Sequence, residues 1–308
     1  MIQTENLTKT YGKLLALSDL SLKIEKGKVF GFIGPNGAGK STTMMILSTL
    51  LAPSSGKAFV AGYDVMKDPK AVRQSLGYMP DFFGVYDNLK ATEYLNFYAG
   101  AYNIPQSKRT SLIADLLELV NLSNKADAYV DSLSRGMKQR LGLARCLVHS
   151  PEVLILDEPA SGLDPRARIE MREILKQLRA MGKTILISSH ILPELAELCD
   201  EIGVIEKGKL IACGSVDEVS VGTRGISVMI LKTLNNEELA QQLMAASPFV
   251  RRLDHKQNHF RFHFTGTDMD KTALLQQLIT AGVAVVHFGE SKENLEDVFL
   301  AITEGVGN

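Results

Sequence analysis

Hydrophobic and polar residues alternate in blocks along the first 222 residues of the chain. Residues 28–33 (KVFGFI), 153–157 (VLILD) and 184–188 (TILIS) have the length and composition of strands that are buried on both faces. Residues 40–51 and 165–181 carry apolar side chains at helical spacing. This order of strands and helices predicts an α/β domain over residues 1–222, in which helices cover a mostly parallel sheet.

Two further regions depart from this pattern. Between about residues 90 and 150 the strand-like runs stop, and the spacing in 111–122 (SLIADLLELVNL) predicts an inserted helical subdomain. Residues 223–308 predict a small α+β accessory domain. Its segments are, in order, a strand (ISVMILK), a helix (NEELAQQLMAA), a hairpin (VRRLDHKQNHFRFHF), a helix (KTALLQQLITAG), a strand (VAVVHFG) and a helix (NLEDVFLAIT).

Three histidines in this second domain, His255, His259 and His263, are spaced four residues apart, which on a helix is typical of a metal site. Residues 259–264 (HFRFHF) alternate between polar and apolar side chains, so their period is that of a strand. We therefore expect the histidines to lie on the polar face of a strand. Metal binding is the less favoured alternative.

The overall charge is balanced, with 34 Lys and Arg against 35 Asp and Glu, so no general basic field favours a nucleic acid partner. Cys146, Cys199 and Cys213 lie far apart and match no zinc or disulfide pattern. The first residues lack the basic and apolar segments of a targeting signal, and no run of 18 apolar residues occurs. We expect a cytoplasmic chain that does not itself cross a membrane.

A phosphate-binding loop is the strongest chemical signal. GPNGAGKST matches the pattern G-x-x-x-x-G-K-[ST] between a predicted strand and a predicted helix, which is the context that the pattern requires. The glycines let successive backbone N–H groups point into one concavity at a helix N-terminus. We expect the side chain of Lys40 to reach the β- and γ-phosphates and the hydroxyl of Ser41 to bind Mg²⁺. The predicted nucleotide contacts are Gly34, Pro35, Asn36, Gly37, Ala38, Gly39, Lys40, Ser41 and Thr42.

Polar residues end two other predicted strands, at the edge of the sheet where the loop is expected. Asp157 and Glu158 follow VLIL, and neighbouring residues point in different directions, so the two carboxylates can have different tasks. We expect Asp157 to hold the Mg²⁺ shell and Glu158 to act as general base on the attacking water. His190 ends TILISSH and is expected within reach of the γ-phosphate.

A second polar turn, LSRGMKQR at residues 133–140, is rich in backbone donors and cations. It begins the last helix of the predicted insertion, far along the chain from Lys40. One nucleotide does not need two such loops. The segment therefore raises the question of which ligand it serves.

The order of these motifs resembles that of the ATP-binding subunit of an ABC transporter, over about the first 220 residues. The phosphate loop comes first, then 133–140 as the signature segment, 153–159 (VLILDEP) as the Walker B strand, SGLD at 161–164 as the dimer-contact loop, and His190 as the switch histidine. The resemblance implies a P-loop NTPase of ABC type that binds ATP and Mg²⁺ and hydrolyses ATP. Lys40, Glu158 and His190 are its expected catalytic residues.

The same resemblance implies a role for the second loop. In this family two subunits pack head to tail, as a homodimer or a heterodimer, with ATP between them. Ser134 and Gly136 of one chain would then hydrogen-bond the γ-phosphate held by Lys40 of the other chain. Tyr11, in KTYGK, matches the aromatic residue that stacks on adenine.

The family works with integral membrane permease subunits, so the resemblance implies a peripheral protein at the cytoplasmic face of the membrane, with no nucleic acid partner. The GMK run at 136–138 and the C-terminal extension resemble the lipid-exporter and type-2 export branches. Two departures from the family pattern stand out: the usual LSGGQ is LSRGM here, and Asp81 replaces the usual glutamine. We expect Asp81 to reach Mg²⁺ through a water and to lie near the permease contact.

Other ATPases share the same cassette. DNA-repair and chromosome-organising members carry long heptad insertions, which this sequence lacks, and ribosome-associated members usually have two cassettes in one chain. A kinase or GTPase with an isolated phosphate loop would not need the signature segment and SGLD. Transport is the leading interpretation, with a non-transport ATPase acting on DNA or ribosomes as the alternative.

Overall fold

The structure is a computed structural model, and it describes residues 1–81, 84, 88–189, 195, 197–216, 218–219 and 227–290. His190 and the predicted helix at 294–303 lie outside the described residues. The chain forms two compact units, Met1–Val216 and Asp217–Asn308, and each is described by itself. Within the described part, no helix is long and apolar enough to cross a membrane.

A six-stranded sheet forms the centre of the first unit, and it has the predicted parallel character. Its order is β10-β9-β3-β8-β7-β6, and only β10 runs antiparallel to its neighbour. All residues of β3, β7 and β8 are buried, because helices or a second sheet cover both faces. The strands are β3 (Val29–Ile33), β6 (Leu76–Met79), β7 (Val153–Leu156), β8 (Thr184–Ser189), β9 (Glu201–Glu206) and β10 (Lys209–Gly214).

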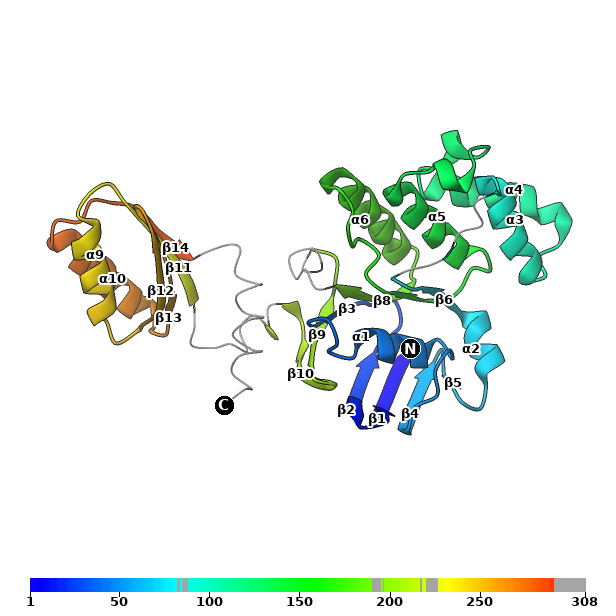
Figure 1. Cartoon of the computed structure of the whole chain (residues 1–308), viewed down its shortest axis with the longest axis horizontal. Helices are drawn as coiled ribbons and strands as arrows, with labels where there is room; N and C mark the ends of the chain where they lie inside the picture. The colour runs from blue at the N-terminus through cyan, green and yellow to red at the C-terminus, as the bar shows by residue number, and fades with distance from the viewer. Residues whose placement is uncertain are drawn as a thin grey trace. The chain divides into compact units, whose positions relative to one another are not determined.

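A second, antiparallel sheet in the same unit was not part of the sequence prediction. Its order is β2-β1-β4-β5, with strands at Leu14–Ile24, Ile2–Tyr11, Ser55–Val60 and Tyr63–Asp64, respectively. Helix α1 (Lys40–Leu47) lies between the two sheets (Figure 1) and buries Met44, Ile46 and Leu47 in their common core. The two sheets therefore enclose the helix that follows the phosphate loop.

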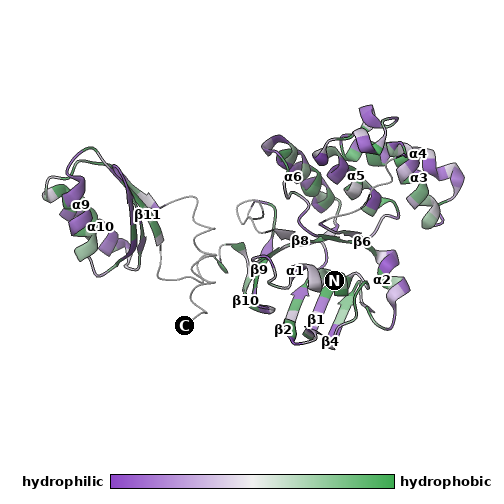
Figure 2. Ribbon diagram, in the orientation of Figure 1, coloured by the Kyte–Doolittle hydropathy of each residue, from purple (hydrophilic) through white to green (hydrophobic). Residues whose placement is uncertain are grey.

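The predicted helical insertion is confirmed, and it follows the short helix α2 (Pro69–Ser75). It consists of α3 (Ala91–Ala101), α4 (Gln106–Leu119), two 3₁₀ turns at Ser123–Lys125 and Val130–Ser132, and α5 (Arg135–Leu147). Helices α5 and α6 (Pro165–Ala180) cover the face of the six-stranded sheet opposite α1 (Figure 1). Along α6 one side is hydrophobic and the other hydrophilic (Figure 2), which explains why it packs as a single layer.

Over its described residues 227–290, the second unit is a four-stranded antiparallel sheet of order β12-β13-β11-β14 with two helices. Phe260, Phe262 and Phe264 are fully buried in its core, together with apolar residues of both helices. Its elements are β11 (Ser227–Thr233), α9 (Glu237–Ala246), β12 (Val250–Lys256), β13 (His259–Phe264), α10 (Asp268–Thr280) and β14 (Val285–Glu290).

The three histidines of the second unit do not share one face of its sheet. His259 and His263 lie on the polar face of β13, as predicted, because they alternate with the buried phenylalanines. The prediction was wrong for His255, which lies opposite Phe260, on the other face, and stacks on its ring with a centroid distance of 4.4 Å. An irregularity in β12 between Arg251 and Asp254 reverses the alternation. Among the described residues, no three His, Cys, Asp or Glu side chains are placed to hold a metal ion.

Candidate active site

The phosphate loop connects β3 to α1, and segments from distant parts of the chain hold it on both sides. A Cβ on Gly34 would collide with the carbonyl oxygen of Ile205 in β9, and one on Gly39 would lie 2.9 Å from the carbonyl oxygen of Ala16. Gly39 also has a φ of 113°, a conformation that glycine adopts without strain. The N–H of Gly208 donates to the carbonyl of Ala38 at 2.9 Å. Glycine at positions 34 and 39 is therefore required by close packing as well as by the backbone turn.

Lys40 lies inside this loop, with 6% of its side chain exposed. Its ammonium group donates to the carbonyls of Gly34 at 2.6 Å and Pro35 at 3.3 Å. The same group lies 3.7 Å from Oε1 of Glu158. Lys40 thus holds the loop closed by hydrogen bonds and also meets the end of the β7 strand.

The two predicted carboxylates follow β7, and a residue that sequence reasoning missed fixes them. The hydroxyl of Ser188, in β8, donates to Oδ1 of Asp157 at 2.6 Å and accepts the backbone N–H of Glu158 at 2.8 Å. Asp157 is 2% exposed, so this bond is shielded from water. Glu158 has a φ of 50°, a left-handed conformation that is uncommon for a residue with a side chain. Ser188 is the first residue of the polar end of TILISSH, and this position was its sequence signal.

Carboxylates outnumber cations around the loop. Burial lowers the pKa of Lys40, while the charges of Glu158, Asp157 and Asp81 act in the opposite direction. Among the described residues, these three carboxylates all act on Lys40, and a divalent cation would offset their negative charge. Mg²⁺ usually takes one or two carboxylates and keeps water and phosphate oxygens as its other ligands, so this donor set fits it.

The other predicted contacts are exposed or partly exposed. Ser41 is exposed at the start of α1, and Thr42 is partly exposed beside it. Asp81 is exposed directly after β6, and its charge acts on Lys40, which places it at the same sheet edge. Tyr11 ends β1 with 43% of its surface exposed, and the ammonium of Lys9 lies 5.3 Å from its ring centre.

The signature segment begins α5, on the other side of the six-stranded sheet from α1 (Figure 1). Ser134 is the N-cap of the helix, and its hydroxyl accepts the N–H of Met137 at 3.3 Å. Ser134 and Arg135 are exposed, and Gly136 is partly exposed. A Cβ on Gly136 would lie 2.9 Å from that of Ala167, so this glycine is needed for the close approach of α5 and α6.

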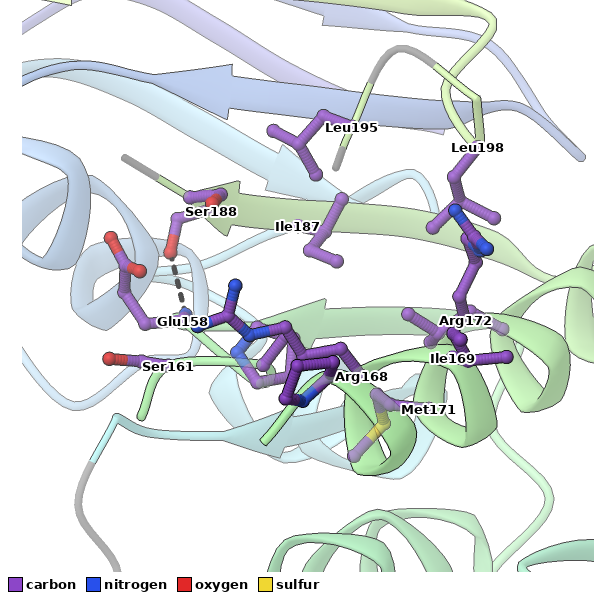
Figure 3. Close-up of a pocket in the computed structure, with 15 residues that line it drawn as sticks. Glu158, Ser161, Arg168, Ile169, Met171, Arg172, Ile187, Ser188, Leu195 and Leu198 are labelled. Atoms are coloured by element: carbon purple, nitrogen blue, oxygen red, sulfur yellow. Dashed lines mark hydrogen bonds between the residues drawn. The ribbon is translucent and has the colours of Figure 1, made fainter. Parts of the chain in front are cut away.

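A pocket of about 270 Å³ lies behind the acidic strand end, between α6 and β8. Glu158 stands at one end of it and Leu198 at the other, with Arg168 between them (Figure 3). Most of its other lining is apolar, including Ile187 and Leu195. The backbone of Glu158 therefore has apolar surroundings on one side and the phosphate loop on the other.

Comparison with known proteins matches this geometry to one family. Residues 17–161 match the ABC transporter family model, and 214–303 match the C-terminal domain of DrrA1-3-like ATP-binding proteins. The linearmycin resistance ATP-binding protein LnrL of Bacillus subtilis is 32% identical over 305 residues, which is 98% of each chain. The chain belongs to the ATP-binding subunits of ABC transporters. Its nucleotide is therefore ATP, and the predicted resemblance is confirmed.

Further relatives agree with this assignment. The Nod factor export ATP-binding protein I of Burkholderia orbicola is 37% identical over 302 residues, covering 98% of this chain and 96% of the relative. A solved dimeric ATP-binding cassette, in a post-hydrolysis state bound to ADP and phosphate, superposes with a TM-score of 0.64 at 25% identity. It covers 70% of this chain and 99% of the cassette. As an ABC-type ATPase, the chain hydrolyses ATP and couples that hydrolysis to transport.

Proposed function

We propose that Glu158 is the general base of this ATPase and that Lys40, Asp157 and Ser188 hold the reacting groups around it. The observation that supports this most directly is the approach of Glu158 to Lys40, at 3.7 Å, in a nearly buried position. Lys40 in this loop would contact the terminal phosphates of the nucleotide. A carboxylate beside Lys40 would therefore be close to the water that attacks the γ-phosphate. Glu158 would accept a proton from that water.

Asp157 has a different task. Its Oδ1 is taken by the Ser188 hydroxyl, which leaves its other oxygen for Mg²⁺ or a bound water. The hydroxyl of Ser41 would supply a second ligand, and Asp81 would act through a water. Bound Mg²⁺ would neutralise charge that develops on the phosphates. His190 is retained as a proposed contact of the γ-phosphate on the family resemblance alone.

The position of the signature segment supports a dimer as the active form of the protein. Ser134 and Gly136 lie on exposed surface across the sheet from α1, so they would serve a nucleotide held by a second subunit. ATP would then lie between two head-to-tail chains, either identical or different, each contributing one phosphate loop and one signature segment. Tyr11 would stack on the adenine of its own chain's ATP.

The membrane partner would contact the same face as Asp81. A hollow of about 300 Å³ opens beside β6, the strand that precedes Asp81 in the chain, and aromatic and basic side chains line it. We assign it to a segment of an integral membrane permease, which would place the chain at the cytoplasmic face of the membrane. Its lining includes Tyr78, Pro80, Tyr98, Tyr102, Arg145 and His149. Export is the proposed direction, because the names of both full-length relatives refer to resistance or export.

Purification of the tagged full chain from detergent-solubilised membranes tests this function. We expect a co-purifying protein with about six apolar segments of roughly 20 residues each, and ATPase activity that depends on Mg²⁺. Co-purification with DNA or ribosomes in place of a membrane protein would contradict the transport role.

A further inference from the structure

Arg135, where the family pattern has glycine, lies against a glycine of the SGLD loop. The Cζ, Nη1 and Nη2 atoms of Arg135 lie 2.5, 2.5 and 2.7 Å from the position that a Cβ on Gly162 would take. These nearly equal distances mean that the flat face of the guanidinium covers the α-carbon of Gly162. Only a residue without a side chain leaves this room, and the φ of 66° at Gly162 also favours glycine.

The positive charge of Arg135 lies at the N-terminus of α5, where a cation is unfavourable. Arg135 is the first residue of the helix, and its first turn contains no acidic residue. A positive charge at this end of a helix is disfavoured by the helix dipole. A structural or functional contact elsewhere is therefore needed to account for an arginine here, and the contact with Gly162 supplies one.

Helix α5 also contacts α6, the helix that follows the SGLD loop, at two further positions. Gly136 packs against Ala167, as described above, and Arg140 forms an ion pair with Glu170 at 3.2 Å. The Arg140 side chain is 8% exposed, so this pair is largely shielded from water. Helix α5 and the start of α6 are therefore in contact at both positions, and Arg135 lies at the end of α5 that faces the loop.

The loop leads from Gly162 back to the proposed general base. The N–H of Ser161 donates to the carbonyl of Glu158 at 3.0 Å, closing a turn. On the other side of Gly162, the Nε of Arg168 donates to the carbonyl of Leu163 at 2.9 Å, and Asp164 caps α6. A displacement of Gly162 would therefore be transmitted to the backbone of Glu158 through one short turn.

We propose that Arg135 is a positioning residue: through its contact with Gly162, it couples the signature segment, which would read the partner's ATP, to Glu158 of its own chain. This inference rests on the proposed function. It differs from a direct role in which Arg135 would contact the partner's γ-phosphate. In the positioning role, Arg135 acts on the hydrolytic site of the chain that carries it.

A double-mutant cycle tests the contact. Gly162→Ala places a methyl group where the guanidinium lies, whereas in an Arg135→Ala chain the same methyl group finds room. We expect each single substitution to lower kcat by about 2- to 30-fold with little change in KM, and the double variant to be no slower than the slower single variant. The strain of alanine at a positive φ is common to both backgrounds and cancels in the cycle. Independent, multiplying effects would overturn the coupling.

Mixed dimers separate positioning from direct phosphate contact. The reference pairs a wild-type chain with a Glu158→Gln chain, so that only one site hydrolyses ATP. Arg135→Ala is then added either to the chain with Glu158 intact or to the Glu158→Gln chain. Positioning predicts a lower rate only in the first arrangement, and a lower rate only in the second would overturn it.

Two controls keep the tests interpretable. Lys108→Ala removes an exposed cation from α4 of the same helical insertion, and we expect it to leave kcat within about twofold. Thermal unfolding by circular dichroism shows whether Arg135→Ala and Gly162→Ala chains fold. A Glu158→Gln homodimer with wild-type activity would contradict the proposed function itself. If the reference mixed dimer is inactive, the double-mutant cycle on homodimers still tests the contact between Arg135 and Gly162.

Discussion

The phosphate loop and the signature segment both offer donors to phosphate, but they are built in different ways. The loop is enclosed by Ile205, Ala16 and Gly208, and its lysine is almost fully buried. Ser134 and Arg135 of the signature segment are exposed, and the hydroxyl of Ser134 accepts the N–H of Met137 in the first turn of its own helix. The phosphate loop is therefore fully built from residues of its own chain. The signature segment presents its donors to the outside, which is the arrangement expected of a site completed by a second subunit.

The largest effect should come from the completed half-site. Glu158→Gln keeps the shape and removes the basic carboxylate, so hydrolysis should fall by about 10²-fold or more while ATP binding survives. Steady-state phosphate release measures the first quantity, and size-exclusion chromatography with ATP should show an accumulated dimer. A variant that hydrolyses ATP at close to the wild-type rate would remove Glu158 from the mechanism.

Mixing two inactive variants tests whether the half-sites combine across subunits. Chains with Lys40→Ala and chains with Gly136→Asp should each be nearly inactive alone. In mixed dimers one site carries both defects and the other carries neither, so ATPase activity should partly return on mixing.

Activity will not return if both sites must work together. Cysteines introduced at Ser134 and Ser41 then give an independent measurement, because ATP should promote crosslinks between different chains. Crosslinks found only within one chain would contradict the head-to-tail arrangement.

The close packing around the phosphate loop predicts a smaller effect, which lowers both the free energy of unfolding and the affinity for ATP. Gly34→Ala forces the loop away from Ile205, which should cost about 1–3 kcal/mol of unfolding free energy and abolish tight ATP binding. Gly62→Ala is the matched control, because Gly62 has a φ of 85° but nothing within 4 Å of a new Cβ. It should cost about 1–2 kcal/mol and leave ATP affinity unchanged. Equal ATP affinities for the two variants would contradict the packing argument.

The smallest effect concerns Asp81. Removing its charge with Asp81→Ala should raise the Mg²⁺ concentration for half-maximal ATPase about fivefold, or roughly 1 kcal/mol, because salt screens part of the ~2 kcal/mol between a divalent cation and a unit charge about 4 Å apart in water. Stimulation by the membrane partner should also weaken, while nucleotide affinity without metal stays the same or improves. Unchanged Mg²⁺ dependence and unchanged stimulation would assign Asp81 to ordinary solvated surface.

Much of the fold could be predicted because its signals are local. Mostly apolar runs of strand length marked β3, β7 and β8, and alternating polar and apolar residues marked β13 of the second unit. The predicted helix at 40–51 ends earlier, at Leu47, because Ser48 caps it and Thr49 has a φ of 61°. The antiparallel sheet was missed because its strands are irregular: β1 shifts register with β2 at three points, which breaks the alternation that marks a half-buried strand.

The same distinction applies to the candidate site. Lys40, Asp157 and Glu158 lie in motifs whose chemistry is visible in a few consecutive residues. Ser188 and the pair formed by Arg135 and Gly162 depend on contacts between segments far apart in the chain, which no local pattern specifies. His255 shows the same limit in the second unit, since one irregularity in β12 was enough to move it to the other face.

The enclosure of the phosphate loop also bears on the order in which the chain becomes competent during synthesis. The loop is made early, but the carbonyl of Ile205 and the N–H of Gly208 that bound it belong to β9 and the turn before β10. A nascent chain that has not yet reached these residues lacks one wall of the loop. Nucleotide binding therefore depends on a contact between the phosphate loop and residues far along the chain. We expect the growing polypeptide to bind its nucleotide only after β9 has joined the central sheet.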